Sequence, residues 1–323
     1  MTAPTPETSQ TQANPFNQLL FDYQNDPAKI QERYETHRTN RTDHFRQKLL
    51  AQDFPGWQVD EILSKLVVQS KDPNGDRAFF DHRHNLNLYA RPPKHIKDLI
   101  ATIREEIRDV APTLWFSPPD SLHITTLEIA SSRTQDEIDA IAAKLIEKGT
   151  AEKLVNYTAD INHRACLIKP MISYDASAMA LSFLPAAEEF TGTAKKESSD
   201  SCTYHHLRQG LADLVLESGT GLAARYVVPS AHVTIARFVT QDGFLLKSGE
   251  VDRDMVAALV SRIERINEKL RRKYWPGTGQ DGEDDSISEG EWVIGQEQGL
   301  EFNKGASWYG GGEKVLIGKG FKP

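Results

Sequence analysis

The sequence contains little cysteine, with Cys166 and Cys202 as the 2 examples in 323 residues. Two cysteines cannot form a disulfide framework, and no Cys-x-x-Cys spacing suggests a zinc site. Long apolar runs are missing as well, so no segment is predicted to span a membrane. The N-terminal residues lack the basic stretch followed by an apolar stretch that marks a secretory signal. We therefore expect a cytoplasmic location, with the nucleus left open.

Positive charge is not in excess either. The 38 Lys and Arg residues are outnumbered by 46 Asp and Glu residues, which gives a formal net charge of −8. Proteins that bind long duplex nucleic acid usually carry a broad basic surface, so we do not expect that partner. A small phosphorylated ligand, or the end of an RNA, needs only a few local cations and is compatible with this composition.

Two short segments repeat one pattern. Each carries His-x-Thr inside an apolar, β-branched run that follows a proline, first at His123 and Thr125 and again at His232 and Thr234. Residues i and i+2 of a strand share a face, so each segment presents an imidazole beside a hydroxyl. One such segment alone is more often an ordinary strand histidine. Two of them predict a duplicated half-site whose groups converge on one ligand.

This set of groups suits the chemistry of phosphate esters. Histidine can accept or donate a proton near neutral pH because its ordinary pKa is about 6.5. Two histidines that flank one phosphorus atom can therefore divide the work, one as base for water and one as acid for the departing oxygen. The hydroxyls of Thr125 and Thr234 can hydrogen-bond the non-bridging oxygens. The scheme requires no metal ion and no other cofactor, and spacing alone leaves the acid and base roles open.

The chain is expected to have three parts. Residues 1–14 are rich in Thr, Gln and Pro and are expected to form a disordered tail. Residues 15–84 have a helical pattern and form an N-terminal helical extension that we expect to pack on the main body. Residues 85–323 alternate between strand-like and helical segments and contain both motifs. Within this part, the acidic, Gly-rich stretch 277–290 is expected to be a mobile loop.

The ordered motifs resemble those of the two-histidine (2H) phosphoesterase superfamily, and in particular its 2′–5′ RNA ligase-like proteins and 2′,3′-cyclic nucleotide phosphodiesterases of the fungal type. Residues 86–93 resemble the opening strand of that family, and residues 118–125 and 229–237 resemble its two motifs. The resemblance implies an α+β fold with two lobes and a pseudo-twofold axis. Two mainly antiparallel sheets would surround a central cleft, with the helical extension outside the common core.

The activity that the resemblance implies is hydrolysis. A metal-independent phosphodiesterase would open the 2′,3′-cyclic phosphate of a nucleotide, or of an RNA 3′ end, to a phosphomonoester, with His123 as the acid and His232 as the base. One alternative is an exonuclease that processes RNA 3′ ends with the same two histidines. Another is a non-catalytic nucleotide-binding scaffold, although binding alone does not need paired acid–base groups. The sequence indicates no particular protein partner.

Two charged residues hold equivalent places after the motifs. The resemblance implies that Arg237 contacts phosphate, but strict strand alternation turns it away from His232, so a bulge is needed to re-aim it. Alternation likewise turns Glu128 away from His123, where its carboxylate would do no harm to an anionic ligand.

The remaining candidates are aromatic residues, basic residues and potential metal ligands. Four aromatic residues are candidates for stacking on a base, namely Tyr89, Phe238, Trp308 and Tyr309. Two others, Trp115 and Phe116, are expected in the core. The basic run 269–273 is expected to be the solvated face of a helix, with the guidance of an RNA end as the alternative. Six further residues are potential metal ligands by type, but their spacings match no metal-site pattern. They are Asp43, Asp81, His82, His84, His205 and His206.

Overall fold

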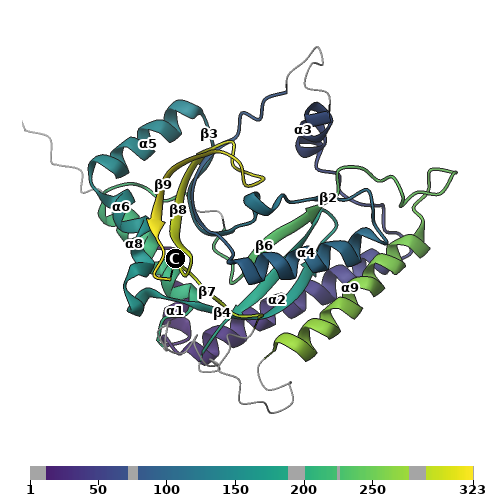
Figure 1. Cartoon of the computed structure of the whole chain (residues 1–323), viewed down its shortest axis with the longest axis horizontal. Coiled ribbons are helices and arrows are strands. Elements are labelled where there is room, and N and C mark those ends of the chain that lie inside the picture. Colours follow the sequence, from purple (N-terminus) through teal and green to yellow (C-terminus); the bar gives the residue numbers. More distant parts are fainter. Residues whose placement is uncertain (1–11, 72–78, 188–200, 224–225, 276–288, 323) are drawn as a thin grey trace, which may run out of the picture.

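The computed structural model describes residues 12–71, 79–187, 201–223, 226–275 and 289–322. Its strands form two antiparallel sheets with helices packed around them (Figure 1). The fold class is therefore α+β with two lobes, as the sequence predicts. The predicted acidic loop at 277–290 lies outside the described residues except for its last two positions.

The four-stranded sheet contains the first motif. Its strand order is β3-β1-β8-β9, and the members are β1 (His84–Ala90), β3 (Ile124–Arg133), β8 (Gln298–Gly305) and β9 (Glu313–Lys319). The helices packed on its strands are α5 (Gln135–Glu147), α6 (Thr150–Val155) and α8 (Tyr204–Glu217). The first motif thus lies at the edge of this sheet, where β3 pairs with β1 alone.

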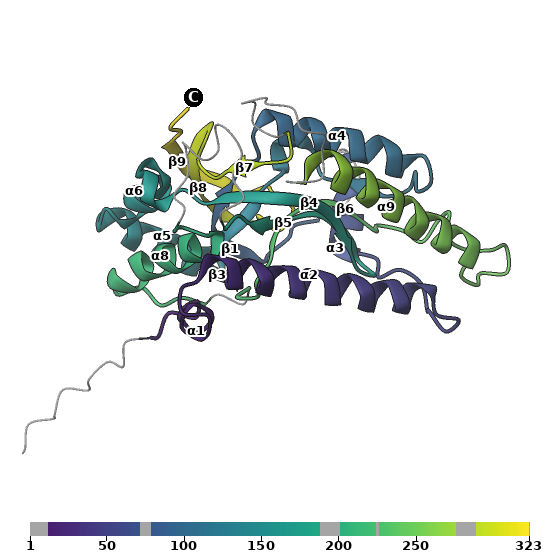
Figure 2. The same ribbon diagram turned by 90° about the horizontal axis from the view of Figure 1, so that it is seen from below.

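The five-stranded sheet contains the second motif. Its order is β2-β6-β5-β4-β7, and the members are β2 (Trp115–Phe116), β4 (Cys166–Tyr174), β5 (Ala178–Pro185), β6 (Ala231–Arg237) and β7 (Trp292–Val293). The helices beside it are α2 (Pro27–Leu50), α4 (Lys94–Arg108) and α9 (Arg253–Tyr274). Figure 2 shows α2 along one face of this sheet and α4 and α9 on the opposite side.

The sequence pattern explains these helices. In α4, apolar residues recur every three or four positions from Ile96 to Ile107 and all of them are buried. Helix α9 does the same from Val256 to Leu270. Helix α2 begins with typical start signals, because the Asp26 side chain accepts hydrogen bonds from the first turn and Pro27 fills the first helical position.

The N-terminal segment is tied to the body of the protein. Besides α2 it contains α1 (Asn17–Asp22) and α3 (Glu61–Lys71). Gln31 donates to the carbonyl of Pro185 and Arg38 donates to that of Lys169, which joins α2 to β5 and β4. Residues 1–11 lie outside the described residues. The predicted tail at 1–14 is nevertheless too long, because residues 12 and 14 hydrogen-bond to the α8 region.

A buried histidine joins three of these helices. His205 of α8 contacts the Tyr34 hydroxyl of α2 at 3.0 Å through Nδ1, and the Phe16 carbonyl next to α1 at 3.0 Å through Nε2. Because a carbonyl only accepts, Nε2 carries the proton in the neutral ring and Tyr34 donates to Nδ1. Burial lowers the pKa of His205 to about 4. This histidine therefore has a structural role and is not a metal ligand.

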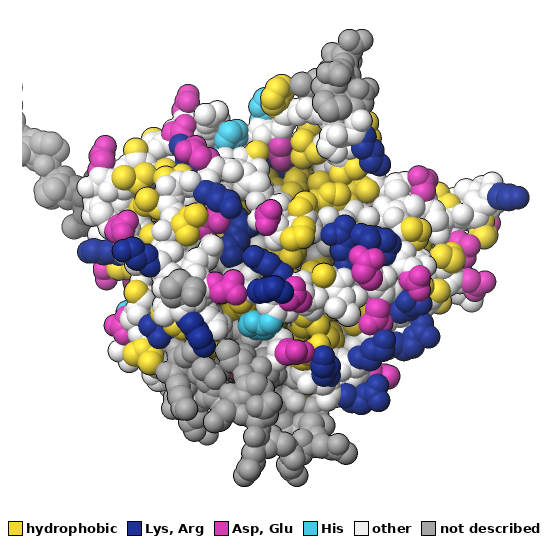
Figure 3. Space-filling model, viewed as in Figure 1, with side chains coloured by type: hydrophobic (Ala, Val, Ile, Leu, Met, Phe, Trp, Pro, Cys, Tyr) yellow, Lys and Arg dark blue, Asp and Glu magenta, His cyan; other side chains and the backbone are white. Residues whose placement is uncertain are grey.

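The two lysines in the basic run of α9 are paired with carboxylates. Lys269 contacts Glu106 at 2.7 Å and Lys273 contacts Glu289 at 3.1 Å. Figure 3 shows acidic side chains interspersed among the basic ones on this side of the molecule. This surface is a mixed, solvated helix face, as expected from the sequence. In the part of the chain that the structure describes, no helix has the length and apolar character needed to cross a membrane.

Candidate active site

Both motifs line one cavity of about 280 Å³ between the two sheets. His123 and Thr125 enter it from the start of β3, and His232 and Thr234 enter it from β6. All four side chains are partly exposed. Residues 109 positions apart in the sequence are thereby brought to a common wall, which is what a ligand held by both half-sites requires.

Each motif strand contains a bulge at the same place. In β3, Thr125 and Leu127 pair with the adjacent residues Tyr89 and Leu88 of β1, so residue 126 is an extra one. In β6, residues 234 and 236 pair with the adjacent residues 180 and 179 of β5, so residue 235 is extra. A bulge shifts the following side chains to the opposite face. The two half-sites are therefore equivalent in backbone as well as in sequence.

The bulges decide where the two charged residues point. Arg237 lines the cavity with His232, because the bulge offsets the alternation that would have turned it away. Glu128 lines the same cavity for the same reason. The expectation that Glu128 faces away from His123 is therefore wrong. The equivalent position holds a cation in one half-site and a carboxylate in the other.

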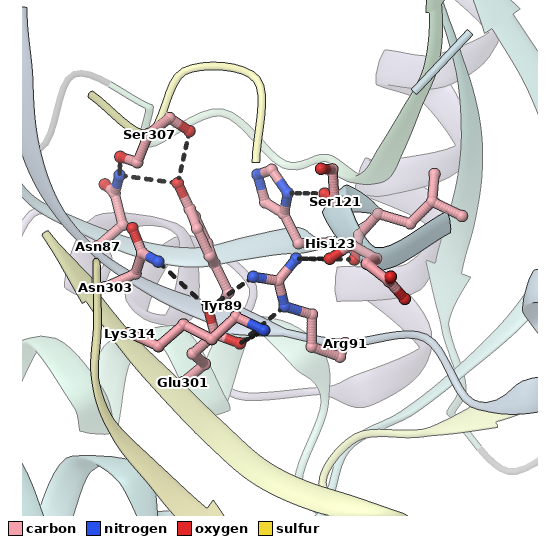
Figure 4. Close-up of polar contacts among 11 residues, drawn as sticks. Asn87, Tyr89, Arg91, Ser121, His123, Glu301, Asn303, Ser307 and Lys314 are labelled. Carbon is pink, nitrogen blue, oxygen red and sulfur yellow. Dashed lines mark hydrogen bonds and ion pairs between the residues drawn. The ribbon is translucent and has the colours of Figure 1, made fainter. Parts of the chain in front are cut away.

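His123 is held by its own loop and by a tyrosine. Its Nδ1 lies 2.7 Å from the carbonyl of Ser121, and its ring lies against that of Tyr89 with centroids 3.9 Å apart (Figure 4). Since a carbonyl can only accept, Nδ1 carries a proton and Nε2 is left for a ligand. Burial lowers the pKa of His123 to about 4, and the Ser121 carbonyl opposes that shift.

A buried ion pair supports the loop before His123. Arg91 donates two hydrogen bonds to Glu301, at 2.9 and 2.5 Å, and contacts the carbonyls of Asp120 and Leu122 (Figure 4). Burial raises the pKa of Glu301, but Arg91 more than offsets this effect, so its pKa lies below the ordinary value. The charged pair therefore fixes the backbone on both sides of residue 121.

His232 is held by two hydroxyls. Its Nδ1 lies 2.9 Å from the Tyr226 oxygen and 3.1 Å from Oγ of Ser230. Burial lowers the pKa of His232 to about 4, and cations, with Arg41 the first of them, lower it further. Burial also raises the pKa of Tyr226, so this hydroxyl keeps its proton. Both catalytic candidates thus use Nδ1 for support and leave Nε2 free of these contacts.

One buried arginine connects the two motifs. Arg208 of α8 donates to the carbonyl of Thr126, the bulge residue of β3, at 3.2 Å. It also donates to the carbonyls of Tyr226 and Val228, which precede the second motif. Its side chain is only 1% exposed. Arg208 therefore sets the backbone of one motif relative to the residue that supports the histidine of the other.

Arg237 is braced by the N-terminal segment. It lies 3.6 Å from the carboxylate of Asp60 and over the ring of Tyr309. Tyr309 donates to Asp60 at 2.7 Å and accepts from Arg83. The residues between α2 and β1 thus hold one wall of the cavity in place.

The aromatic residues predicted for base stacking lie in different environments. Trp308 and Tyr309 line the cavity, and so does Trp115, which we expected in the core. Tyr89 is part of the wall, but it is 1% exposed and its ring is covered by His123. The prediction for Phe238 is wrong, because this residue is buried and stacks on Trp57 with centroids 3.9 Å apart.

Several residues of the site were missed in the sequence. The serine two positions before each histidine supports that ring, through the carbonyl of Ser121 and the hydroxyl of Ser230. The repeated Ser-x-His-x-Thr pattern was the available signal. Tyr226 and Asn87 gave no such signal, since only the fold brings them to the cavity. The described residues contain no group of three or more metal-ligating side chains.

Comparisons with known proteins give distant matches. No protein-family model and no curated protein matches the sequence. A conserved protein of unknown function from Agrobacterium tumefaciens, ATU0111, has 12% identity and a TM-score of 0.43, with 76% of this chain and 95% of that chain covered. Kluyveromyces marxianus Usb1 with uridine monophosphate has 12% identity and a TM-score of 0.35, with 74% and 98% covered. The function proposed below therefore rests on the residues of the cavity.

Proposed function

We propose that this chain is a metal-independent phosphodiesterase of the 2H type that opens the 2′,3′-cyclic phosphate of a nucleotide or an RNA 3′ end. The observation that carries the proposal is the pair of bulged His-x-Thr half-sites on one cavity. Each imidazole is supported through Nδ1, so the Nε2 atoms are available for proton transfer. A scaffold that only binds nucleotides has no need of this duplicated arrangement.

The surroundings of the two histidines favour different roles. Around His232, the cations Arg41, Arg208 and Arg237 all oppose protonation, with Asp175 acting against them. Around His123, the Ser121 carbonyl and Glu301 favour protonation, whereas Arg91 and His232 oppose it. We assign the base role to His232 and the acid role to His123, as the family resemblance implies; more cations surround His232 than His123, which is compatible with a base that stays neutral.

In the proposed reaction, neutral His232 has its proton on Nδ1, which donates to the oxygen of Tyr226 or Ser230, and its Nε2 takes a proton from water as the water oxygen bonds to phosphorus. The bond from phosphorus to one ribose oxygen breaks, and that oxygen takes the proton from Nε2 of His123. The hydroxyls of Thr125 and Thr234 and the Arg237 guanidinium stabilise the charge on the non-bridging oxygens. The product is a phosphomonoester, and proton exchange with solvent restores both histidines.

Substrate binding changes the protonation of the two histidines. Both histidines of the empty cavity have pKa values near 4, so both are neutral at pH 7. A phosphodiester anion between them favours the charged imidazolium and raises these pKa values. Substrate binding thus promotes the singly protonated pair that the reaction requires.

The test is turnover in the presence of EDTA. We expect adenosine 2′,3′-cyclic phosphate, or an RNA ending in a 2′,3′-cyclic phosphate, to be opened. His123→Ala and His232→Ala should each lower kcat by about 10²–10⁴-fold, the usual contribution of a general acid or base. His163→Ala, a histidine stacked on Tyr157 and absent from the cavity wall, is the matched control. Full activity in either variant, or loss of activity in EDTA, contradicts the proposal.

A further inference from the structure

A second cavity of about 340 Å³ adjoins the first. The residues that line both are Tyr226, Ser230, His232, Thr234 and Arg237. The space around the two histidines therefore continues past the second motif. This continuation is as large as the first cavity and is not needed for a cyclic phosphate held between the histidines.

Helix α2 forms one wall of the second cavity. It contributes His37 and Arg41, and the opposite wall comes from β4, β5 and β6 of the five-stranded sheet. The Arg41 side chain is 47% exposed and contacts Asp175 at 2.5 Å. Arg41 is near enough to the reacting groups to lower the pKa of His232. Arg41 therefore places a positive charge in the second cavity, close to His232.

The sheet side of this cavity carries hydroxyl groups. Ser173 and Ser182 hydrogen-bond to each other at 2.7 Å, and Ser182 lies directly across from His232 in the β5–β6 pairing. Tyr174 is 4% exposed, and within the described residues its hydroxyl has no hydrogen-bond partner. Burial raises the pKa of Tyr174 to about 12, so the group remains a donor. A buried donor without a partner costs free energy unless a ligand or water satisfies it.

We propose that the second cavity binds the nucleotide next to the reacting one, so that the substrate is the 3′ end of a single-stranded RNA. This inference builds on the proposed function. A cyclic mononucleotide has no second phosphate, whereas an RNA end has one that Arg41 and His37 can contact. The Tyr174 hydroxyl can donate to a ribose or phosphate oxygen, and the oxygens of Ser173 and Ser182, whose protons are used within the protein, can accept from a ribose hydroxyl. The net charge of −8 is no obstacle, because these contacts are local.

The experiment compares two substrates that differ by one nucleotide, adenosine 2′,3′-cyclic phosphate and the dinucleotide ApA ending in the same cyclic phosphate. We expect kcat/KM to be at least tenfold higher for the dinucleotide. In Arg41→Ala this ratio should fall about tenfold, mainly through KM, and in Tyr174→Phe severalfold. Lys48→Ala removes the same charge from α2 outside the cavity and should leave the ratio unchanged. A ratio near one in the wild type, or unchanged ratios in both cavity variants, overturns the inference.

A binding measurement tests whether the second cavity holds the neighbouring nucleotide without requiring turnover. Calorimetry would compare adenosine 2′-monophosphate with ApA ending in a 2′-phosphate at several salt concentrations. We expect tighter binding of the dinucleotide, a loss of that gain in Arg41→Ala, and a salt dependence reduced by roughly 0.7 in slope for the one lost phosphate contact. Equal affinities overturn the inference even if the cyclic phosphate is opened. If no cyclic phosphate is opened but the dinucleotide still binds more tightly, the proposed catalytic activity is wrong and the proposed role of the second cavity is supported.

Discussion

The two hydroxyls at His232 make a sharp test of how this site works. Tyr226 and Ser230 both lie within hydrogen-bond distance of one nitrogen atom, Nδ1, at 2.9 and 3.1 Å. Removing either hydroxyl leaves the other to support the ring. Removing both leaves Nδ1 without either partner and the orientation of the imidazole unsupported. The effects of Tyr226→Phe and Ser230→Ala should therefore be strongly non-additive.

The magnitude follows from the value of one hydrogen bond. A lost bond that a neighbour can replace costs about 0.5–1 kcal/mol, which is roughly two- to fivefold in kcat. An unsatisfied buried group costs about 1–3 kcal/mol, so with the orientation lost the double variant should reach roughly 10²-fold. The product of the two single effects is at most about 25-fold. The coupling between the hydroxyls should thus be about 1 kcal/mol or more.

The assay is the rate of cyclic phosphate opening, with kcat and KM measured separately for the wild type, both single variants and the double variant. A supporting role predicts losses in kcat and a shift of the pH profile, because Nδ1 contacts tune the base. Tyr157→Phe removes a hydroxyl outside both cavities and serves as the control. Additive losses, or losses confined to KM, would refute the reasoning. Normal circular dichroism in every variant would exclude unfolding.

Three further predictions follow from other contacts. Glu128→Gln removes a carboxylate from the cavity and should lower the Ki of the phosphomonoester product severalfold; an unchanged Ki would mean that its charge does not reach the ligand. Arg208→Lys keeps the charge but cannot reach three carbonyls, so kcat should fall at least tenfold while circular dichroism stays normal, and wild-type kcat would count against a positioning role. The folded-state pKa of His205, about 4, is below its unfolded value of about 6.5, so its contribution to stability is intact above pH 6.5 and is lost as the pH falls towards 4. His123 and His232 contribute to the loss in the same way, so urea unfolding should show a loss over that range that is smaller by roughly 3 kcal/mol in His205→Gln than in the wild type; equal losses in both proteins would contradict this.

The motifs were predictable because their signal is local. His-x-Thr places both side chains on one face whatever the fold around it, and the duplication predicts that the two faces meet. The helix starts and apolar faces of α2, α4 and α9 were predictable for the same reason. Each of these inferences depends on residues within a few positions of one another.

Register and packing account for what could not be predicted. Glu128 and Arg237 reach the cavity only because each strand carries an extra residue, and no local pattern marks residue 126 or 235 as that residue. Phe238, one position beyond β6, is in the core because Trp57 of the N-terminal segment covers it. Trp115 is at the cavity because β2 pairs with the end of β6. All of these depend on chain segments that are distant in sequence.

The division of labour between the two histidines must come from outside the repeated pattern. Both half-sites have Ser-x-His-x-Thr, a bulge at the same offset and an Nδ1 contact, so the repeated pattern by itself gives no preferred direction of proton transfer. The residues that break the symmetry are charged. Position five after the histidine is Glu128 in one half and Arg237 in the other, and Arg41 adds a further cation beside His232. If the cations keep His232 neutral, exchanging these charges should weaken the preference for it as base. The double variant Glu128→Arg, Arg237→Glu should therefore raise the pKa of His232 and move the acidic limb of the pH profile to higher pH, whereas an unmoved acidic limb would place the asymmetry elsewhere.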